Sequence, residues 1–193
     1  MTSAERLELS ALPATPWKNG GGTTREIAAF PPGAGFDTFG WRLSVAEVER
    51  DGPFSAFPGI DRTIALLRGA GMRLRDLVRG DEHALTAAGV PHAFAGEASI
   101  DARLVDGATS DFNVMTRRGQ WSAKVERLQS RARVAAADAL LLLAGAGLWE
   151  AEAHGVLEPG AMLLWRGPIA PVTVAPAGIP GWLLAVRLCQ DRP

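Results

Sequence analysis

Two stretches, IALLRGAGMRL at residues 64–74 and LLLLAGAGLWE at residues 140–150, share one pattern. Each has an apolar run, then Gly-Ala-Gly, then a further apolar residue. A short apolar run that ends at a turn signal is typical of a buried β-strand. Because the pattern occurs twice, we expect two copies of one small β-barrel in the chain.

The similarity between the two stretches continues along the chain. TAAGVPHAFAG at residues 86–96 resembles LEPGAMLLWRG at residues 157–167, and each is followed by a later strand-like segment. The alternative is chance, because Leu, Ala and Gly are common in this sequence. The expected organisation is one compact unit over residues 1–193, with repeats at about residues 55–118 and 130–193 and with the N-terminal strands of residues 1–54 shared between them.

Turn signals also favour an all-β chain. The 22 glycines and 13 prolines are spread evenly and leave only short segments between them. Within these segments the hydrophobic period is mostly two, as in WRLSV at residues 41–45, where apolar and polar residues alternate. Helix and strand compete for residues 73–82 and 135–144, because short apolar runs do not decide between them.

Composition narrows the functional classes. The chain has 193 residues, 47% hydrophobic, with a net charge of -1, so no global field favours nucleic acid or an anionic membrane. The N-terminus does not resemble a signal peptide, and the longest apolar run falls short of the roughly 18 residues of a membrane span. The lone cysteine, Cys189, excludes an internal disulfide. We therefore expect a soluble cytoplasmic protein.

The stretch WKNGGGTTREIAAFP at residues 17–31 places three glycines beside polar groups. The glycines form either a tight bend or a site where backbone N–H groups approach a bound anion. The segment after them is predicted to be a strand with Thr23, Arg25 and Ile27 on one face and Thr24 and Glu26 on the other. Alternation alone does not say which face points inward.

Two further polar segments carry candidate binding residues. In SDFNVMTRR at residues 110–118, Asp111 and Asn113 share one face, which either is exposed or lines a hollow barrel and orients a small ligand. In FSAFPGIDRTI at residues 54–64, Asp61 and Arg62 are adjacent and therefore diverge on a strand. Arg62 is either a buried carboxylate-binding residue or a member of a surface ion pair.

Catalytic and metal-binding motifs are not found. The histidines His83, His92 and His154 do not have the spacing of a shared metal site, and Cys189 has no histidine near it in the sequence. No metal site and no cofactor are therefore expected, unless the fold gathers scattered ligands.

Four motifs together resemble the HutD/Ves family: WKNGGGTTREIAAFP, WRLSVAEV, GPFSAFPGIDRTIALLRGAG and DFNVMTRRG. The resemblance implies an all-β bicupin, with two cupin-like β-barrels in one chain and few short helices. Enzymatic cupins hold a metal through a Gly-x5-His-x-His motif with a later Glu and His. Here only His92 falls where the later histidine is expected, so the metal-dependent chemistry of cupins is poorly supported.

The family resemblance further implies a bacterial protein that binds a small carboxylate metabolite, such as urocanate or a formylglutamate-like acid, and modulates histidine catabolism. Arginine suits such a ligand because its fork binds a carboxylate through two hydrogen bonds. The candidate ligand-binding residues are Lys18, Asn19, Gly20, Gly21, Gly22, Thr24, Arg25, Glu26, Trp41, Arg42, Arg62, Asp111 and Asn113.

Two other functional classes remain open. One is a metal-independent cupin enzyme acting on a sugar or an organic acid, with Asp111 or Glu26 as general acid or base. The other is an interaction module or homodimer that uses sheet edges or exposed aromatic residues such as Trp149 and Trp165, although aromatic residues of β proteins usually fill cores.

Overall fold

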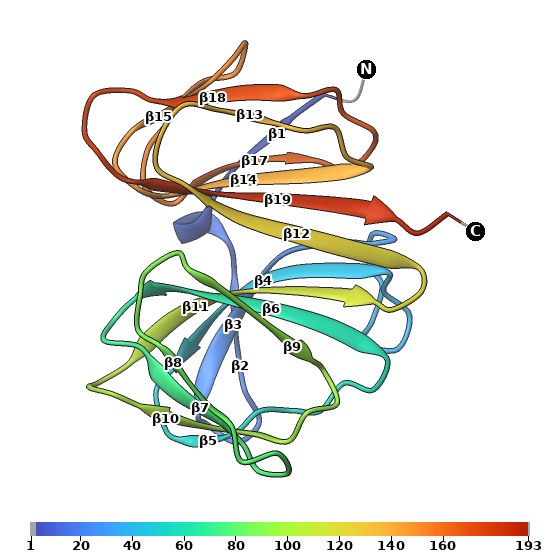
Figure 1. The fold of residues 1–193 in the computed structure, drawn as a ribbon, viewed down its shortest axis with the longest axis vertical. Coiled ribbons are helices and arrows are strands. Elements are labelled where there is room, and N and C mark those ends of the chain that lie inside the picture. The colour runs from blue at the N-terminus through green and yellow to red at the C-terminus, as the bar shows by residue number, and fades with distance from the viewer. Residues whose placement is uncertain (1–2, 193) are drawn as a thin grey trace. The chain divides into compact units, whose positions relative to one another are not determined.

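The computed structural model describes residues 3–192, and its elements are strands apart from one short 3-10 helix (Figure 1). The chain divides into two compact units. The N-terminal unit comprises Pro13–Gln120. The C-terminal unit comprises Trp121 onward together with the chain up to Leu12. The all-β prediction is confirmed.

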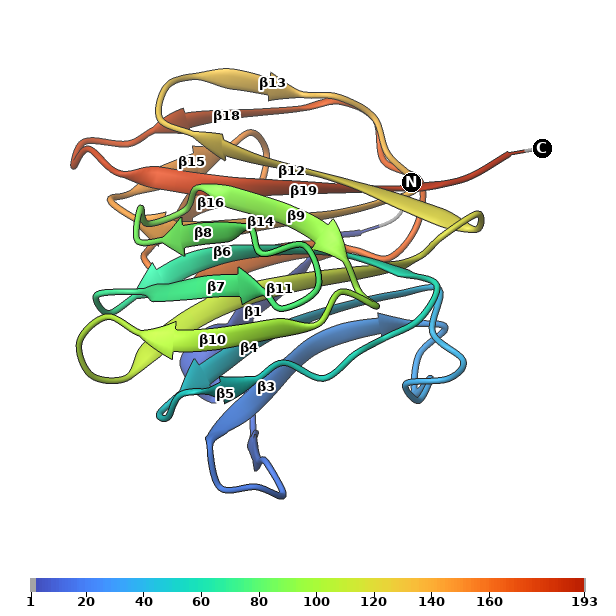
Figure 2. The same cartoon turned by 60° about the horizontal axis from the view of Figure 1, so that its bottom comes forward.

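The N-terminal unit consists of two antiparallel sheets. The six-stranded sheet has the order β2 (Ala14–Pro16), β3 (Gly22–Phe30), β4 (Trp41–Val48), β11 (Thr109–Arg117), β6 (Ile60–Arg68) and β9 (Pro91–Ala95). The four-stranded sheet has the order β5 (Gly52–Pro53), β10 (Ile100–Leu104), β7 (Met72–Asp76) and β8 (Glu82–Leu85). Figure 2 shows β10, β7 and β8 side by side in this second sheet.

The C-terminal unit also consists of two antiparallel sheets. The five-stranded sheet has the order β1 (Glu5–Glu8), β17 (Ala161–Trp165), β14 (Ala139–Ala146), β19 (Trp182–Gln190) and β12 (Trp121–Leu128). The four-stranded sheet has the order β13 (Ala132–Val134), β18 (Val172–Pro176), β15 (Trp149–Ala151) and β16 (Gly155–Leu157). The helix η1 (Leu9–Ala11) follows β1.

The two units repeat one strand order. The run β4-β11-β6-β9 corresponds to β12-β19-β14-β17, and β5-β10-β7-β8 corresponds to β13-β18-β15-β16. The two Gly-Ala-Gly sequences lie at equivalent places in this scheme: residues 69–71 connect β6 to β7, and residues 145–147 include the end of β14 and the start of the turn to β15. The sequence similarity therefore falls on topologically equivalent strands.

The expected repeat boundaries differ from those of the units. The sequence placed the start of the first repeat near residue 55, but the unit begins at Pro13, because β3 and β4 pair with the rest of its main sheet. The first 54 residues are divided between the units, since β1 pairs with β17. The ambiguous residues 135–144 contribute to strand β14, and residues 73–82 contribute to β7 and β8.

The interiors of the two units differ. A continuous apolar cluster that includes Leu140, Leu142, Trp149, Trp165 and Leu183 fills the C-terminal unit. Trp149 and Trp165 are both buried, so they do not form the exposed aromatic surface that one of the hypotheses required. In the N-terminal unit the apolar clusters fill only part of the interior, which also contains a cavity lined by both apolar and polar side chains.

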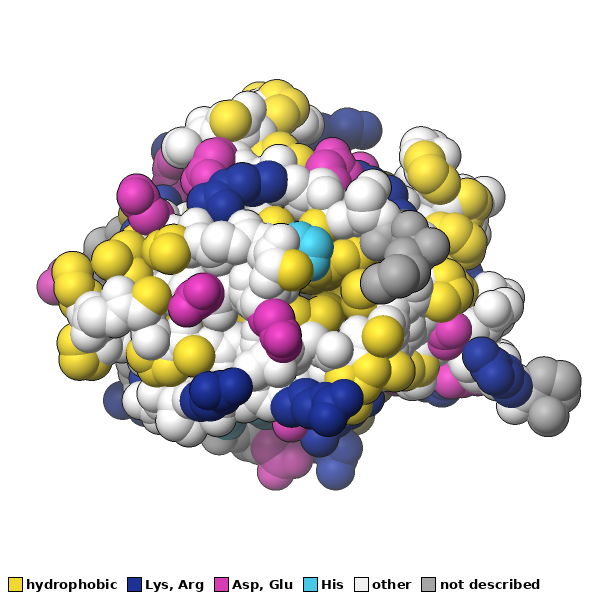
Figure 3. Space-filling view, turned by 90° about the horizontal axis from the view of Figure 1, so that it is seen from above, with side chains coloured by type: hydrophobic (Ala, Val, Ile, Leu, Met, Phe, Trp, Pro, Cys, Tyr) yellow, Lys and Arg dark blue, Asp and Glu magenta, His cyan; other side chains and the backbone are white. Residues whose placement is uncertain are grey.

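The surface agrees with the near-neutral composition. On the face shown in Figure 3, basic and acidic side chains lie interspersed, as a net charge of -1 leads one to expect. Within residues 3–192, no helix has the length and apolar character needed to cross a bilayer.

Candidate functional site

The N-terminal unit contains a cavity of about 810 Å³. Strands β3, β4, β11 and β6 form its wall, and the segments at residues 15–19 and 53–57 contribute further lining residues. Each of these four strands contributes one charged side chain to the wall. They are Glu26 on β3, Arg42 on β4, Asp111 on β11 and Arg62 on β6.

Sheet register places two arginines at one level of this wall. Met115 of β11 pairs with Arg42 of β4 on one side and with Arg62 of β6 on the other. Because neighbouring strands lie about 5 Å apart, the two arginine backbones are about 10 Å apart. All three side chains line the cavity. The two guanidinium groups therefore flank a space that suits a small anion.

The next levels of the same wall are uncharged or acidic. Asn113 lies two residues from Met115 on the same face of β11, and Asp111 lies two residues further. Their neighbours across the sheet are Ser44 beside Asn113 and Ala46 beside Asp111. The wall thus changes from basic to hydrogen-bond-accepting along β11.

Arg62 is held in an aromatic enclosure. Its side chain is 6% exposed, and its guanidinium carbon lies 5.3 Å from the ring centre of Phe54, 5.5 Å from that of Phe57 and 4.9 Å from that of Phe94. Nη1 donates a long hydrogen bond of 3.4 Å to the carbonyl of Ser55, and Nε has no hydrogen-bond partner among the described residues. Burial lowers the pKa of Arg62 to about 10, so the group remains a cation at neutral pH. The guanidinium group of Arg62 therefore retains N–H donors that a ligand can use.

Arg42 is already paired. Its Nε donates to Oε2 of Glu26 at 2.8 Å, and its Nη1 donates to Oγ of Ser44 at 3.2 Å. The ring of Phe36 lies 4.8 Å from its guanidinium carbon. Glu26 therefore competes with any anionic ligand for this arginine.

Asp111 is a buried carboxyl group. It is 2% exposed, and its Oδ1 has no hydrogen-bond partner among the described residues. Burial raises the pKa of Asp111 to about 7, against the opposing charge of Arg62 and with a smaller contribution from Glu47. Oδ1 of Asn113, which is 9% exposed, also has no hydrogen-bond partner among the described residues.

The three glycines form a turn and do not line the cavity. Gly20 has a φ of 67°, the N–H of Gly21 donates to Oδ1 of Asn19 at 3.0 Å, and a Cβ on Gly22 would overlap the carbonyl oxygen of Glu47. Beside this turn, Nε1 of Trp17 donates to Oγ1 of Thr24 at 2.7 Å. The backbone N–H of Gly21 is therefore satisfied within the protein, which agrees with the tight bend, one of the two alternatives for these glycines.

The structure brings most of the predicted residues together. Eight line the cavity: Lys18, Asn19, Thr24, Glu26, Arg42, Arg62, Asp111 and Asn113. Five do not: Gly20, Gly21, Gly22, Arg25 and Trp41. Arg25 and Trp41 are next to lining residues in the sequence, and successive side chains of a strand point to opposite faces. The expectation that Arg25 projects into the pocket is corrected accordingly.

Sequence reasoning missed several lining residues. Trp17, Phe36, Ser44, Phe54, Phe57 and Met115 also line the cavity. Alternation provides a signal for two of them, because Ser44 shares a face with Arg42, and Met115 shares one with Asn113. The aromatic residues lie outside the wall strands, so no strand periodicity marks them.

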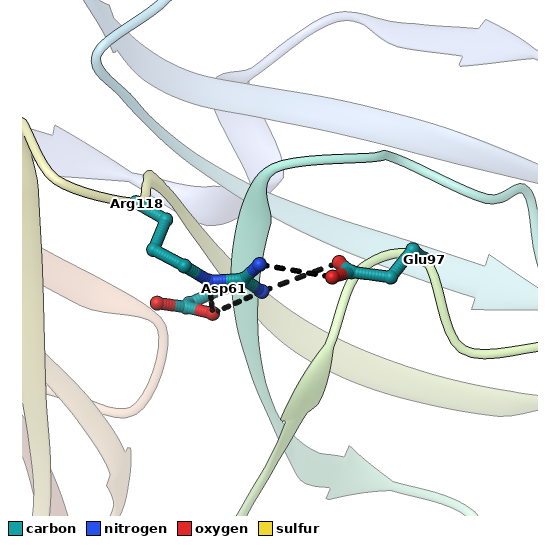
Figure 4. A network of polar contacts seen from close by, with 3 residues as sticks. All are labelled: Asp61, Glu97 and Arg118. Atoms are coloured by element: carbon teal, nitrogen blue, oxygen red, sulfur yellow. Dashed lines mark hydrogen bonds and ion pairs between the residues drawn. The ribbon is translucent and has the colours of Figure 1, made fainter.

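The adjacent residues Asp61 and Arg62 have different surroundings. Asp61 faces away from the cavity and accepts from Arg118 at 2.7 Å, and Arg118 also donates to Glu97 at 2.9 Å (Figure 4). These side chains are about half exposed. Surface ion pairing therefore applies to Asp61, whereas Arg62 is the buried residue.

Comparison with known proteins identifies the family. A model described as HutD matches residues 9–178. The chain belongs to the HutD family. This HutD-family chain is 38% identical over 143 residues to an uncharacterized 21.2 kDa protein in the hutC 3' region of Pseudomonas putida, covering 74% of each chain. It is 41% identical over 122 residues to the protein Ves of Citrobacter koseri, covering 63% of this chain but only 62% of that one.

Solved structures agree with the family and the fold. The structure of HutD from Pseudomonas fluorescens SBW25 superposes with a TM-score of 0.86 at 28% identity, covering 98% of this chain and 100% of that one. A cupin 2 conserved barrel domain protein from Leptotrichia buccalis superposes with a TM-score of 0.61 at 9% identity over 97% of each chain. The second likeness shows a cupin-like fold and nothing about function.

The cavity of this HutD-family chain does not fit the metal site of enzymatic cupins. Among its lining residues the carboxylates are Glu26, which pairs with Arg42, and Asp111, and none is a histidine. Elsewhere, His92 stacks on His83, and His154 packs edge-on against Trp165. Across residues 3–192, no group of three or more His, Cys, Asp or Glu side chains is arranged to hold a metal ion.

Proposed function

We propose that the N-terminal unit binds a small metabolite through its carboxylate. The observation that carries this proposal is Arg62, a buried cation that keeps unused donor capacity on the wall of a cavity. Burial of a charge is costly unless the charge is paired, and its three aromatic neighbours compensate only in part. A carboxylate that accepts two hydrogen bonds from the guanidinium satisfies the remaining donors.

The dimensions of the cavity support a ligand of metabolite size. Its volume of about 810 Å³ is within the range of small-molecule pockets. Arg42 lies at the same level of the wall as Arg62 and provides a second cationic group. An acid with two anionic groups, or with one carboxylate and a polar tail, fits this arrangement.

The candidate ligands come from the family. The Pseudomonas putida relative is described as lying in the hutC 3' region, which associates that protein with a hut locus. Urocanate and formylglutamate-like acids are therefore the first ligands to test, and modulation of histidine catabolism through ligand binding is part of the proposal. Both ligands carry the carboxylate that Arg62 would bind.

Isothermal titration calorimetry with urocanate and formylglutamate tests this proposal. We expect Arg62→Gln to weaken binding by about ten- to a hundredfold, because a hydrogen bond to a charged group contributes about 1.5–3 kcal/mol. Arg25→Gln is the matched control, since Arg25 lies outside the cavity, and it should bind as the native protein does. Equal loss in both variants, or no binding of either acid, would remove the proposal.

A metal-independent enzyme is the second candidate, and Asp111 favours it. A carboxyl group with a pKa of about 7 inside a cavity is suited to act as a general acid or base near neutral pH. Mass spectrometry of each acid after long incubation with stoichiometric native protein tests it. Quantitative recovery of the unchanged acid, with binding demonstrated on the same sample, would exclude catalysis on that acid.

A further inference from the structure

Two buried acceptor oxygens on the cavity wall have no donor. Oδ1 of Asp111 and Oδ1 of Asn113 lack hydrogen-bond partners among the described residues, although the side chains are only 2% and 9% exposed. Buried polar atoms in folded proteins are nearly always hydrogen-bonded. Both side chains line the cavity, so a molecule in the cavity can supply the missing donors.

The strand places these two residues at a defined backbone spacing from the level of the arginines. Asn113 is two residues from Met115, which marks the level of Arg42 and Arg62, and Asp111 is four residues from it. At a rise of about 3.4 Å per residue, these separations are about 7 Å and 14 Å along the wall. The cationic level, formed by Arg42 and Arg62, and the accepting level, formed by Asn113 and Asp111, therefore lie at different positions along the strands of the same wall.

The accepting level differs chemically from the cationic level. An ionised carboxylate only accepts hydrogen bonds, and it repels a second anionic group. A dicarboxylate that extended from the arginines towards Asp111 would bring like charges together. A group that carries N–H or O–H bonds would instead satisfy Asn113 and Asp111 at no such cost.

We propose that Asn113 and Asp111 form a second subsite that binds a hydrogen-bond donor of the ligand, so that the preferred ligand is an acid with an N–H or O–H group about 7 Å from its carboxylate. This inference rests on the proposed function, because it takes the carboxylate to be bound at Arg42 and Arg62. The subsite would bind acids that have an amide, hydroxyl or ring N–H at the far end more tightly than acids that have an ester or a second carboxylate there.

Two probes with the same five-carbon acid chain test this subsite. Glutaramate carries one carboxylate and a terminal primary amide, whereas monomethyl glutarate carries the same carboxylate and a terminal ester without N–H bonds. We expect the native protein to bind glutaramate at least tenfold more tightly than the ester in calorimetric titrations at pH 8. Glutarate, with a second carboxylate, should bind no more tightly than the ester.

Variants assign this preference to the subsite. In Asn113→Leu, which is similar in size but cannot accept a hydrogen bond, we expect the preference for glutaramate to fall below threefold while the affinity for the ester is retained. Arg62→Gln should weaken both probes equally and leave their ratio unchanged. Thermal unfolding of each variant checks that it is folded, and the comparison of the probes on native protein does not depend on any variant.

The outcomes separate the two proposals. Equal binding of glutaramate and the ester by the native protein would overturn the donor subsite, because water then satisfies the oxygens, and it would leave carboxylate binding intact. A preference for glutaramate that persists in Asn113→Leu and in Asp111→Leu, neither of which keeps an acceptor at the substituted position, would also overturn it. Failure of every probe, urocanate and formylglutamate included, would remove the proposed function and this inference with it.

Discussion

The imidazole rings of His83 and His92 stack with their centroids 3.6 Å apart and their planes 9° apart. Burial and the nearby His83 both lower the pKa of His92. The unfolded chain therefore takes up the proton at a higher pH than the folded protein does, and the contribution of His92 to stability should fall as the pH drops below about 6.5, opposite in sign to that of Asp111. In His92→Gln this loss should be smaller, as measured by urea unfolding between pH 7.5 and 5.

The control for this prediction is His154→Gln. His154 packs edge-on against Trp165 and is not stacked on a second histidine. Its substitution should leave the loss of stability on acidification closer to that of the native protein. The same profile in His92→Gln and in the native protein would contradict the assignment to the stacked pair.

Asp111 should make the protein less stable as the pH rises. Its folded pKa of about 7 lies above the ordinary value of 3.8 for an aspartate, so the folded state binds the proton more tightly than the unfolded chain does. Stability should therefore decline between about pH 4 and pH 7, by roughly 1 kcal/mol per pH unit at most. Asp111→Asn should be more stable than the native protein at pH 8 and similar to it near pH 4.

Denaturant unfolding of the two proteins at pH 4.5, 6 and 8 measures this difference. Glu97→Gln is a suitable control, because Glu97 is an exposed carboxylate whose pKa is lowered by its hydrogen bond to Arg118. Its substitution should remove stability above the pKa of the unfolded chain, which is the opposite direction. An Asp111→Asn variant that is less stable at pH 8 would show that the carboxylate is better satisfied than its burial indicates.

The ion pair between Glu26 and Arg42 should oppose the binding of acids. Its 2.8 Å contact occupies a guanidinium nitrogen that an anionic ligand would use. The pair is partly exposed, and such pairs contribute about 0.2–1 kcal/mol. Glu26→Gln should therefore strengthen the binding of glutaramate or urocanate by up to about fivefold. Weaker binding in this variant would indicate that Glu26 holds Arg42 in its binding position.

The glycines of the turn should differ in their tolerance of a methyl group. In Gly22→Ala the new Cβ would overlap the carbonyl oxygen of Glu47, so we expect a loss of about 3 kcal/mol or more and a fall in soluble yield. In Gly20→Ala nothing lies within 4 Å of the new Cβ, and the cost of a φ of 67° is about 1–2 kcal/mol. Thermal unfolding measures both, and equal losses would contradict the steric explanation.

Period-two alternation and frequent turn residues were enough to predict the all-β fold. The Gly-Ala-Gly stretches predicted which strands are equivalent, because a strand that ends at such a turn has the same role in each unit. The start of the N-terminal unit was not predictable in this way. Strands β3 and β4 belong to its main sheet through pairing with β11, which is distant in sequence.

The inward face of the cavity strands could not be read from the sequence. Every residue of β11 except the last is buried, so its polar and apolar faces do not differ in exposure. The same holds for β4, where Trp41 and Ser44 are both buried on opposite faces. For this reason both Arg25 and Glu26 were candidates, and only Glu26 lines the cavity. Arg62 was a candidate because an arginine fork suits a carboxylate, but the sequence left a surface ion pair open as the alternative.

The contact between Gly22 and the carbonyl of Glu47 restricts how the cavity can be redesigned. Lys18 and Asn19 line the cavity from the same turn, and Gly20 has open space around it. A directed-evolution library for a new specificity should therefore accumulate changes at positions 18 and 19 and recover glycine at positions 20 and 22. The turn thus combines replaceable cavity-lining residues with a glycine that cannot be replaced, and selectivity can be altered there without disturbing the strands that carry the arginines.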